Sequence, residues 1–546
     1  MESRIPADSV QRCRTACRAI RTVDGQHRQH STGDPHRSCA FRDKEQIQAV
    51  RTLTISALLL FTIVRLHAAE ARPNVLFIAI DDLRTALGCY GDPLAKSPNL
   101  DRFAATARRF DHAYTQQAIC GPSRTSLLTG RLPDNTRVWH NRNLFRDTCP
   151  DLVTLPQLFK NNGYQALALG KIFSGDEREL DPVSWSAPEV LKQPGWSNYV
   201  LREDTVKGKG AAYEAADVPD DGYSDGKLAT LAVGTLEKLQ QKKEPFFLAV
   251  GFFKPHLPFN APKKYWDLHD PEVFALPEQT RVIGAPEIAY HTHRELGGYR
   301  DVPEDERVSA VEARKLRHGY YACVSYVDAQ VGRLLDALQR LGLAQNTIVV
   351  LWGDHGWSLG EKDRWCKATN FECDTRVPLM VRVPGMAKPG LPTKALVESV
   401  DIYPTLAALA GLTPPADLDG SSFVPVLQDP GARGHDHVLS QFSRPFKAGN
   451  PEIMGHSIRT STHRYTRWIE WSTRKVLAEE LYDYTAPTSV TQQAAFLIER
   501  QNIVAEPAQA AMRDQMRLKL DETLSTRIKP VSVPTPEKKA KKKKNK

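Results

Sequence analysis

Four apolar segments recur along the chain, and each of them stops abruptly at polar residues. They span residues 74–80, 165–169, 246–250 and 347–352. Their apolar residues are continuous rather than alternating, which indicates strands that are buried on both faces, as in a parallel sheet covered by helices. Segments 228–239 and 314–341 repeat apolar residues at helical spacing and supply such helices. We therefore predict an α/β fold built around a large, mostly parallel sheet.

The residues that end these strands have metal-binding or acid–base capacity. They are Asp81 and Asp82 after the first strand, Lys171 after the second, His256 after the third, and Asp354 with His355 after the fourth. Ligands of open α/β sheets bind beyond the carboxyl ends of the strands, where all of these side chains fall. Four such coincidences in one chain predict a functional site at this edge of the sheet.

Three of these residues, Asp81, Asp82 and Asp354, are carboxylates that would repel one another without a cation. Oxygen ligands of this kind favour a hard divalent ion, Ca²⁺ or Mg²⁺, over zinc. His355 either completes the ligand shell or binds an oxygen of the substrate or nucleophile. An Asp-Asp pair alone also suits a turn or helix cap, but the matching Asp354-His355 pair favours the metal site.

A cysteine stands at the start of a short predicted helix. In Cys120-Gly121-Pro122-Ser123-Arg124, Pro122 suits a first helical turn, and Gly130 suits the C-terminal cap of a helix over 125–129. Cys120 then lies at the positive end of the helix dipole, with Arg124 one turn along on the same side. This arrangement suits an anion site or an activated nucleophile, the alternative being a small buried hydrophobic residue.

The net charge of +9 is concentrated at the two ends of the chain. The first 72 residues carry +5 and residues 529–546 carry +7, which leaves the body between them at −3. Nothing therefore marks the body as a nucleic-acid binder. We interpret the lysine-rich segment 529–546 as a solvated, disordered tail.

The N-terminal region contains an apolar run, 53–64, that is too short to span a bilayer comfortably. Small residues around Ala69 follow it, so we predict a secretory signal peptide over 50–71, export to the periplasm or the medium, and no stable membrane anchor. Residues 1–49 are polar and arginine-rich and make an implausible start for such a signal. Our hypothesis is that translation begins near Val50 and that residues 1–49 are not made, or else form a disordered extension.

The Cys120 motif, together with Thr129-Gly130-Arg131, resembles the signature of type I sulfatases of the alkaline-phosphatase superfamily. Lys254-Pro255-His256 and the segments 354–361 and 367–371 are similar to the iduronate-2-sulfatase branch. The resemblance covers about residues 73–490. It implies a large mixed sheet in a catalytic domain over 72–434, and a smaller C-terminal subdomain with a short antiparallel sheet over 435–528. Within that subdomain, the segments 457–471 and 477–484 are each predicted to form a short strand.

The resemblance also implies a chemistry. Cys120 would be oxidised to formylglycine by a formylglycine-generating enzyme, and one hydroxyl of the hydrated aldehyde would attack sulfur while the second expels sulfate. A metal ion, Ca²⁺ with Mg²⁺ as the alternative, would be held by Asp81, Asp82, residue 120, Asp354 and His355.

Sulfate-ester cleavage spreads negative charge over several oxygens, so cations are needed around them. Arg124, Lys171 and Lys367 are the candidates. His256 would protonate the leaving alcohol, and the resemblance places Trp357 at the rim of the pocket near the sugar.

One departure from the branch stands at Ser174, where these sulfatases carry a histidine three residues after the strand-end lysine. A serine hydroxyl can donate a hydrogen bond, but unlike histidine it cannot take up a proton at neutral pH. Either His140 or another group substitutes, or turnover is reduced, or the substrate differs.

The leading prediction is a sulfatase acting on sulfated carbohydrate. One alternative is a phosphomonoesterase or phosphodiesterase of the same superfamily. The other is a degenerate, non-catalytic binder of sulfated glycans, for which Ser174 is the sole support. The sequence assigns no disulfide, although Cys366 and Cys373 are near enough in sequence to pair.

Overall fold

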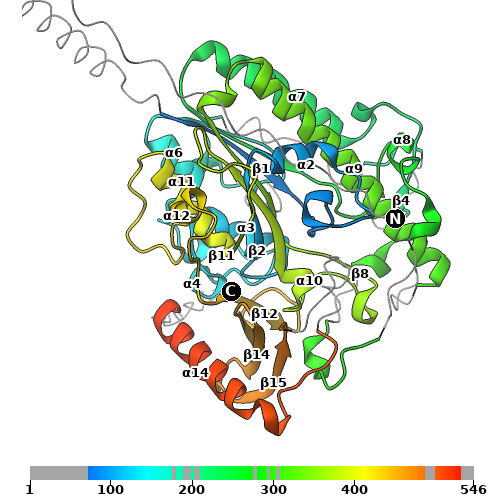
Figure 1. The fold of residues 1–546 in the computed structure, drawn as a ribbon, viewed down its shortest axis with the longest axis vertical. Coiled ribbons are helices and arrows are strands. Elements are labelled where there is room, and N and C mark those ends of the chain that lie inside the picture. Colours follow the sequence, from blue (N-terminus) through cyan, green and yellow to red (C-terminus); the bar gives the residue numbers. More distant parts are fainter. Residues whose placement is uncertain are drawn as a thin grey trace, which may run out of the picture. The chain divides into compact units, whose positions relative to one another are not determined.

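A seven-stranded sheet forms the centre of the fold (Figure 1). Its strands are, in spatial order, β11 (Thr393–Glu398), β2 (Arg108–Tyr114), β10 (Arg376–Arg382), β7 (Thr347–Gly353), β1 (Asn74–Ile80), β5 (Phe246–Phe252) and β3 (Gln165–Gly170). The neighbours β7, β1, β5 and β3 are parallel, whereas β10 runs antiparallel to both of its neighbours. These four parallel strands are the four predicted apolar segments, so the prediction of a mostly parallel mixed sheet is confirmed.

The structure is a computed structural model that describes residues 72–174, 180–187, 198–201, 210–274, 280–291, 295–302, 308–485 and 499–529. The residues from Arg72 onward form one compact unit. The predicted signal peptide, the 49 residues before it and the tail after Lys529 lie outside the described residues.

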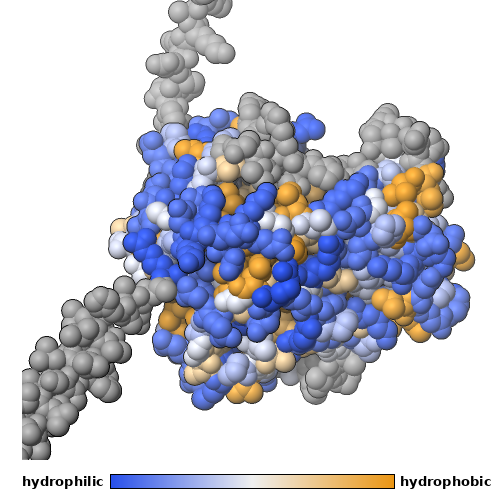
Figure 2. Space-filling model, turned by 90° about the horizontal axis from the view of Figure 1, so that it is seen from above, coloured by the Kyte–Doolittle hydropathy of each residue, from blue (hydrophilic) through white to orange (hydrophobic). Residues whose placement is uncertain are grey.

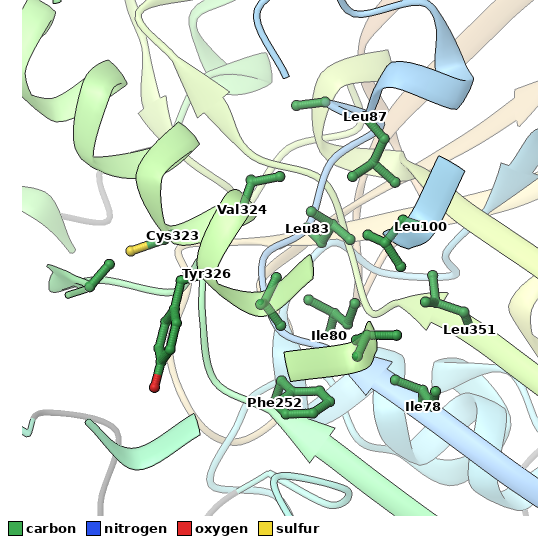
Figure 3. Close-up of a cluster of buried hydrophobic side chains, with 14 of the residues drawn as sticks. Ile78, Ile80, Leu83, Leu87, Leu100, Phe252, Cys323, Val324, Tyr326 and Leu351 are labelled. Carbon is green, nitrogen blue, oxygen red and sulfur yellow. The ribbon is translucent and has the colours of Figure 1, made fainter. Parts of the chain in front are cut away.

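Helices cover both faces of the sheet (Figure 1). One layer contains α2 (Pro98–Ala104), α7 (Ser224–Lys242) and α9 (Ala310–Arg340), and the other contains α3 (Cys120–Thr129), α6 (Leu155–Asn161) and α11 (Ile402–Leu409). In Figure 3, Ile78, Ile80 and Leu351 of the sheet gather with Val324 of α9 in the core of the first layer. Phe77, on the opposite face of β1, packs in the second core. Burial on both faces explains why the strands are apolar without alternation.

The two predicted long helices exist but extend further than their apolar pattern. α9 begins at Ala310 rather than at 314, because Ser309 caps it by accepting the N–H of Glu312. α7 runs over Ser224–Lys242 rather than over 228–239. The additional turns lie at the ends of the helices, where apolar residues do not recur at helical spacing.

A second sheet, called here the C-terminal sheet, contains β12 (Val438–Arg444), β13 (Ile453–Arg459), β14 (His463–Glu470) and β15 (Val476–Asp483), all antiparallel to their neighbours. The prediction of one strand over 457–471 is wrong, because the chain reverses between Thr460 and His463 and forms two strands. Met516 and Leu520 of α14 (Ala510–Arg527) pack on this sheet. The predicted short antiparallel C-terminal sheet is therefore present.

Figure 2 shows hydrophilic side chains over most of one face, with hydrophobic ones in small separate patches. Within the ranges that the structure describes, no helix combines the length and the apolar character that crossing a membrane requires.

Candidate active site

The ends of two neighbouring strands bring the predicted acidic residues together. Asp81 and Asp82 follow β1, and Asp354 follows β7, which pairs with β1 in parallel. The backbone N–H groups of Asp82 and His355 both donate to Oδ1 of Asp354, each over 3.0 Å. Asp82 has a φ of 59°, a left-handed conformation that aspartate tolerates better than most residues. The parallel register therefore places these side chains side by side.

The helix that carries the cysteine is longer than predicted. α3 begins at Cys120 rather than at 125, and Gly130 ends it with a φ of 66°. Every residue of this helix is buried. Oγ of Ser123 donates to the carbonyl oxygen of Asp354 over 2.5 Å, which ties the first turn of α3 to the end of β7. Cys120 is held at the helix N-terminus by this buried contact.

The thiol of Cys120 points into the acidic cluster. Its Sγ lies 3.4 Å from Oδ1 of Asp81 and 3.3 Å from Nε2 of His355. One potential ligand atom from each of Asp81, Asp82, Cys120 and His355 lies within 4.8 Å of the others. Oδ2 of Asp354 is 3.6 Å from Nε2 of His355. All five predicted metal-binding residues therefore converge in space.

Three cationic side chains surround this cluster. Nζ of Lys171 lies 2.5 Å from Oδ2 of Asp81 and 3.4 Å from Sγ of Cys120. Nζ of Lys367 lies 2.8 Å from Oδ1 of Asp82 and 3.7 Å from the same Sγ. Arg124 donates to Oδ2 of Asp354 over 2.8 Å and to Oδ1 of Asp81 over 3.2 Å. The two lysines thus approach Cys120 directly, whereas Arg124 holds two of the carboxylates.

Burial and charge shift the acid–base behaviour of the site in opposite ways at the two adjacent carboxylates. Burial alone would raise the pKa of Asp81, but Lys171, His256 and Arg124 hold it well below its ordinary value. At Asp82, burial prevails over Lys367, and the pKa lies well above its ordinary value. Burial, followed by the charge of Asp81, raises the pKa of the Cys120 thiol to about 12. The unmodified thiol is therefore protonated at neutral pH.

The donor set fits a hard divalent cation. Carboxylate oxygens of Asp81 and Asp82 converge with Nε2 of His355 on the position of residue 120. Such an oxygen-rich set suits Ca²⁺ or Mg²⁺ and lacks the several thiolate or imidazole ligands typical of zinc. The buried aspartates also supply the negative charge that such an ion requires.

His256 lies at the edge of the cluster, and its ring faces two acceptors. Nδ1 is 2.5 Å from the carbonyl oxygen of Leu257, and Nε2 is 3.1 Å from Oε1 of Glu295. These contacts suit a ring protonated on both nitrogens. Burial and the charge of Lys367 oppose this and lower the pKa of His256, while Asp81 and the hydrogen bond to Glu295 raise it.

Glu295 is a site residue that the sequence did not indicate. Its Oε1 lies 3.1 Å from Nε2 of His256 and 3.3 Å from Nζ of Lys367, so it links the two. The residue precedes a short 3₁₀ turn over Leu296–Gly298 and follows neither a strand nor a recognisable motif. No periodic signal was therefore present to reveal it.

Trp357 is a buried residue beside the site. Its side chain is 1% exposed and packs against the ring of Phe259 in the core of the first helical layer. Nζ of Lys367 lies 5.0 Å from the centre of its ring. The indole therefore packs beside the ammonium group of Lys367, and a position of Trp357 at the pocket rim near a sugar stays a prediction.

The residues connected with the Ser174 departure lie apart from the thiol contacts. Ser174 is half-buried, and among the described contacts it makes no hydrogen bond to the site. The ring of His140 packs against Phe446 at 4.5 Å, and Nδ1 of His140 accepts the N–H of Arg142.

Cys373 is a free thiol 3.1 Å from Oγ of Ser358, so it forms no disulfide with Cys366.

Two glycines allow Lys171 to reach the site. A Cβ at Gly251 would lie 1.9 Å from the carbonyl oxygen of Lys171, and a Cβ at Gly170 would lie 2.2 Å from that of Gly251. Gly170 also has a φ of 72°. The ends of β3 and β5 therefore approach each other more closely than any side chain would permit.

Family comparison agrees with this geometry. A family model described as sulfatase matches residues 73–412. The chain belongs to the sulfatase family. A second model, described as the C-terminal part of N-sulphoglucosamine sulphohydrolase, matches residues 353–526 of this sulfatase.

Iduronate 2-sulfatases are among the relatives of this sulfatase. The mouse (Mus musculus) protein is 36% identical over 491 residues, which cover 76% of this chain and 87% of that protein. The human (Homo sapiens) protein is 36% identical over 486 residues, which cover 74% and 86%. The sulfatase is thus a type I, iduronate-2-sulfatase-like member of the family and a sulfuric ester hydrolase.

Solved structures share its fold. The phosphonate monoester hydrolase from Silicibacter pomeroyi superposes with a TM-score of 0.67 at 22% identity, covering 84% of this chain and 96% of that one. BT4656, in complex with its substrate D-glucosamine-2-N,6-O-disulfate, gives a TM-score of 0.65 at 23% identity, covering 83% and 98%. The alkaline-phosphatase-like fold predicted from the sequence is confirmed.

Proposed function

We propose that this sulfatase hydrolyses sulfate esters of carbohydrates, in a glycosaminoglycan or another sulfated glycan, with Ca²⁺ and with formylglycine formed from Cys120. The observation that carries the proposal is the convergence of Asp81, Asp82, Asp354 and His355 on one buried helix N-terminus at residue 120. Relatives named ulvan-active sulfatase and N-acetylglucosamine-6-O-sulfatase, at 27% and 28% identity, support a carbohydrate substrate.

Formylglycine and the metal ion would supply two kinds of chemistry. The hydrated aldehyde of formylglycine provides the attacking hydroxyl and a second hydroxyl for release of sulfate, and Ca²⁺ provides Lewis-acid polarisation and a lowered hydroxyl pKa. Asp81, Asp82, Asp354 and His355 would hold the ion together with residue 120. The fit rests on their oxygen-rich donor set.

The cationic side chains divide the remaining work. Lys171 and Lys367, whose Nζ atoms lie 3.4 and 3.7 Å from Sγ of Cys120, bind the sulfate oxygens on which negative charge accumulates. Arg124 keeps Asp81 and Asp354 in place through its two buried ion pairs. His256 donates a proton from Nε2 to the leaving alcohol.

Maturation and export belong to the same proposal. A formylglycine-generating enzyme acts on Cys120, and the protein is exported after removal of a signal peptide over 50–71. The mature chain consists of a catalytic domain over 72–434, a C-terminal subdomain over 435–528 and a lysine-rich tail over 529–546. N-terminal sequencing of the precursor tests the translation start, and peptides from residues 1–49 would contradict a start near Val50.

Mass spectrometry and sulfate release test the central claim together. The tryptic peptide that contains residue 120 is expected to be about 18 mass units lighter than the cysteine form, because a thiol has become an aldehyde. Cys120→Ala is expected to abolish sulfate release from sulfated oligosaccharides. An unmodified thiol in active enzyme, or undiminished activity of Cys120→Ala, contradicts the proposal. Faster hydrolysis of aryl phosphate than of aryl sulfate would instead favour a phosphoesterase.

Metal removal provides a separate test. Dialysis against a chelator is expected to lower activity by at least about a hundredfold, since loss of the ion leaves converging carboxylates and removes the Lewis acid. Addition of Ca²⁺ should restore activity and raise the thermal unfolding midpoint, because an ion that binds the folded state stabilises it. Full activity after chelation would refute the metal role.

A further inference from the structure

A cavity of about 780 Å³ lies between α4 (Pro133–Thr136), the C-terminal sheet and the last turns of α14. Apolar and basic side chains line it together, and the basic ones are Arg137, Arg467, Arg474 and Lys529. The acidic groups in the wall are already engaged. Asp134 accepts hydrogen bonds from Trp139 and Gln441 and lies 2.9 Å from Nε2 of His456, and Asp521 pairs with Arg467 at 2.6 Å.

Two arginines in this wall have no carboxylate partner among the described residues. The guanidinium of Arg474 lies 4.2 Å from the ring centre of Trp471, and that of Arg137 lies 5.4 Å from the ring centre of Trp139. The two indoles contact each other edge to face at 5.5 Å. These four residues are called here the Arg-Trp cluster. Its two guanidinium groups form no ion pair with a described carboxylate, and they lie with the ring of Trp471 at one cavity.

The backbone at both arginines is unusual. Arg137 has a φ of 63° and Arg474 a φ of 62°, in the left-handed region where glycine or asparagine is the unstrained choice. The positive φ that each turn requires therefore does not explain why arginine stands at these two positions. Arginine differs from glycine and asparagine at these positions by its long, charged side chain.

We infer that this cavity is a second binding subsite, separate from residue 120, for a sulfated segment of a carbohydrate chain. Arg137 and Arg474 bind sulfate oxygens, since a planar guanidinium presents paired N–H donors to an oxyanion. Trp471 packs against the apolar face of a sugar ring. The inference rests on the proposed carbohydrate substrate and adds to it the recognition of a chain longer than the cleaved residue.

The path of the chain links the cavity to the active site. Oδ1 of Asn141 accepts the N–H of Gly121 over 2.8 Å, directly beside Cys120. Arg137 precedes Asn141 by four residues, which span at most about 14 Å even when fully extended. The cavity therefore lies at a distance from the active site that an oligosaccharide of a few sugars spans. The sequence after Lys529 contains seven lysines and one glutamate, so the tail is a poor occupant for a basic cavity.

Binding in the absence of turnover tests the subsite. The full chain with Cys120→Ala is titrated with a heparin hexasaccharide and with its desulfated counterpart. Adding Arg137→Gln and Arg474→Gln is expected to weaken binding of the sulfated probe by about tenfold or more, because two charge-assisted contacts are lost. Arg474→Gln alone should give an intermediate loss, and since Arg474 is exposed this single variant does not threaten folding.

Arg433→Gln is the matched control, because Arg433 is 82% exposed, pairs with Asp436 and does not line the cavity. Unchanged affinity in the double variant, an equal loss in Arg433→Gln, or equal binding of the desulfated probe would each overturn the subsite.

Kinetics of the otherwise wild-type enzyme separate this inference from the proposed function. With both arginines replaced, KM for sulfated heparin oligosaccharides should rise by about tenfold, while hydrolysis of an aryl sulfate should stay unchanged. Sulfate release from the oligosaccharides with an unchanged KM would refute the subsite and leave the proposed function intact. Weaker binding in the double variant, together with a wild-type enzyme that releases no sulfate, would support the subsite and refute the function.

Discussion

Residue 120 lies among three carboxylates and three cationic side chains. Buried charges are tolerated only when they are paired, and Arg124 satisfies two of the aspartates at once. Lys171 and Lys367 pair with Asp81 and Asp82 and at the same time approach the thiol. In the proposed mechanism, the same two ammonium groups bind the substrate anion while a divalent ion neutralises the aspartates.

Glu295 supports both sides of this arrangement, and its replacement should affect leaving-group chemistry. Glu295→Gln keeps the size of the side chain but removes the charge that faces Nε2 of His256 and Nζ of Lys367. We expect kcat for a sugar sulfate to fall about tenfold, since general acid catalysis contributes roughly a hundredfold or more. Hydrolysis of 4-nitrophenyl sulfate should change little, because its leaving group departs without protonation.

His256→Gln should show the same substrate dependence with a larger loss. Glu287→Gln is the control, because Glu287 is exposed and pairs with Arg281 outside the site. An equal loss on both substrates would show that Glu295 maintains structure and does not assist His256.

At the scale of helices and strands, the elements whose apolar residues form a clear pattern were predicted correctly. Elements without such a pattern were missed or given wrong bounds. The strands before Asp81, Lys171 and Asp354 were recognisable because burial on both faces leaves continuous apolar runs that end at the site. The full length of α3, from Cys120 to Thr129 and not only over 125–129, was not recognisable, because a helix buried on every side has no amphipathic period. The turn at Thr460–His463 was missed for a related reason, since it contains no glycine or proline.

Single side chains outside such patterns were the least predictable. Glu295 reaches the site from an irregular segment, and the position of Trp357 depends on how Phe259 packs against it. Both are consequences of tertiary structure, which local sequence does not report. Residues that directly follow strands were predictable because the parallel sheet itself places them.

The junction of β3 and β5 should not tolerate any side chain. Gly251→Ala would place a Cβ 1.9 Å from the carbonyl oxygen of Lys171, so β3 must shift and carry Lys171 away from Cys120. We expect a loss of stability of about 1–3 kcal/mol and a kcat reduced at least about tenfold. Thermal unfolding and aryl sulfatase activity measure the two effects.

Gly234→Ala is the matched control, because a Cβ there has no atom within 4 Å and the residue lies inside α7. It should stabilise the protein by about 0.5–1 kcal/mol with activity unchanged. Normal activity of Gly251→Ala would show that the close approach of these strands is dispensable.

In the whole molecule, a buried ionic cluster joins the C-terminal sheet to the central sheet. Glu372 of α10 (Glu372–Thr375) accepts a hydrogen bond from the hydroxyl of Tyr114 in β2 over 2.9 Å. Nη2 of Arg464 in β14 donates to the same carboxylate over 2.7 Å, and Nε of Arg459 in β13 lies 3.4 Å away. This cluster is therefore one of the buried attachments between the C-terminal sheet and the central sheet.

The attachment should depend on pH through Glu372. Burial alone would raise its pKa, but Arg459 and Arg464 lower it to about 2. A depressed native pKa stabilises the folded state above the unfolded value near 4.5, and this contribution is lost as the pH falls toward 2. Glu372→Gln should therefore lower the free energy of unfolding by about 3 kcal/mol at pH 7, and by less than half of that at pH 3.

Urea unfolding at several pH values measures this difference. Glu272→Gln serves as the control, since Glu272 is exposed and its pair with Arg314 contributes little at any pH. A constant difference between wild type and Glu372→Gln from pH 7 to pH 3 would show that Glu372 acts through packing rather than through its charge. A difference that shrinks with acidity would show that the charge of Glu372 stabilises the attachment of the C-terminal sheet to the central sheet.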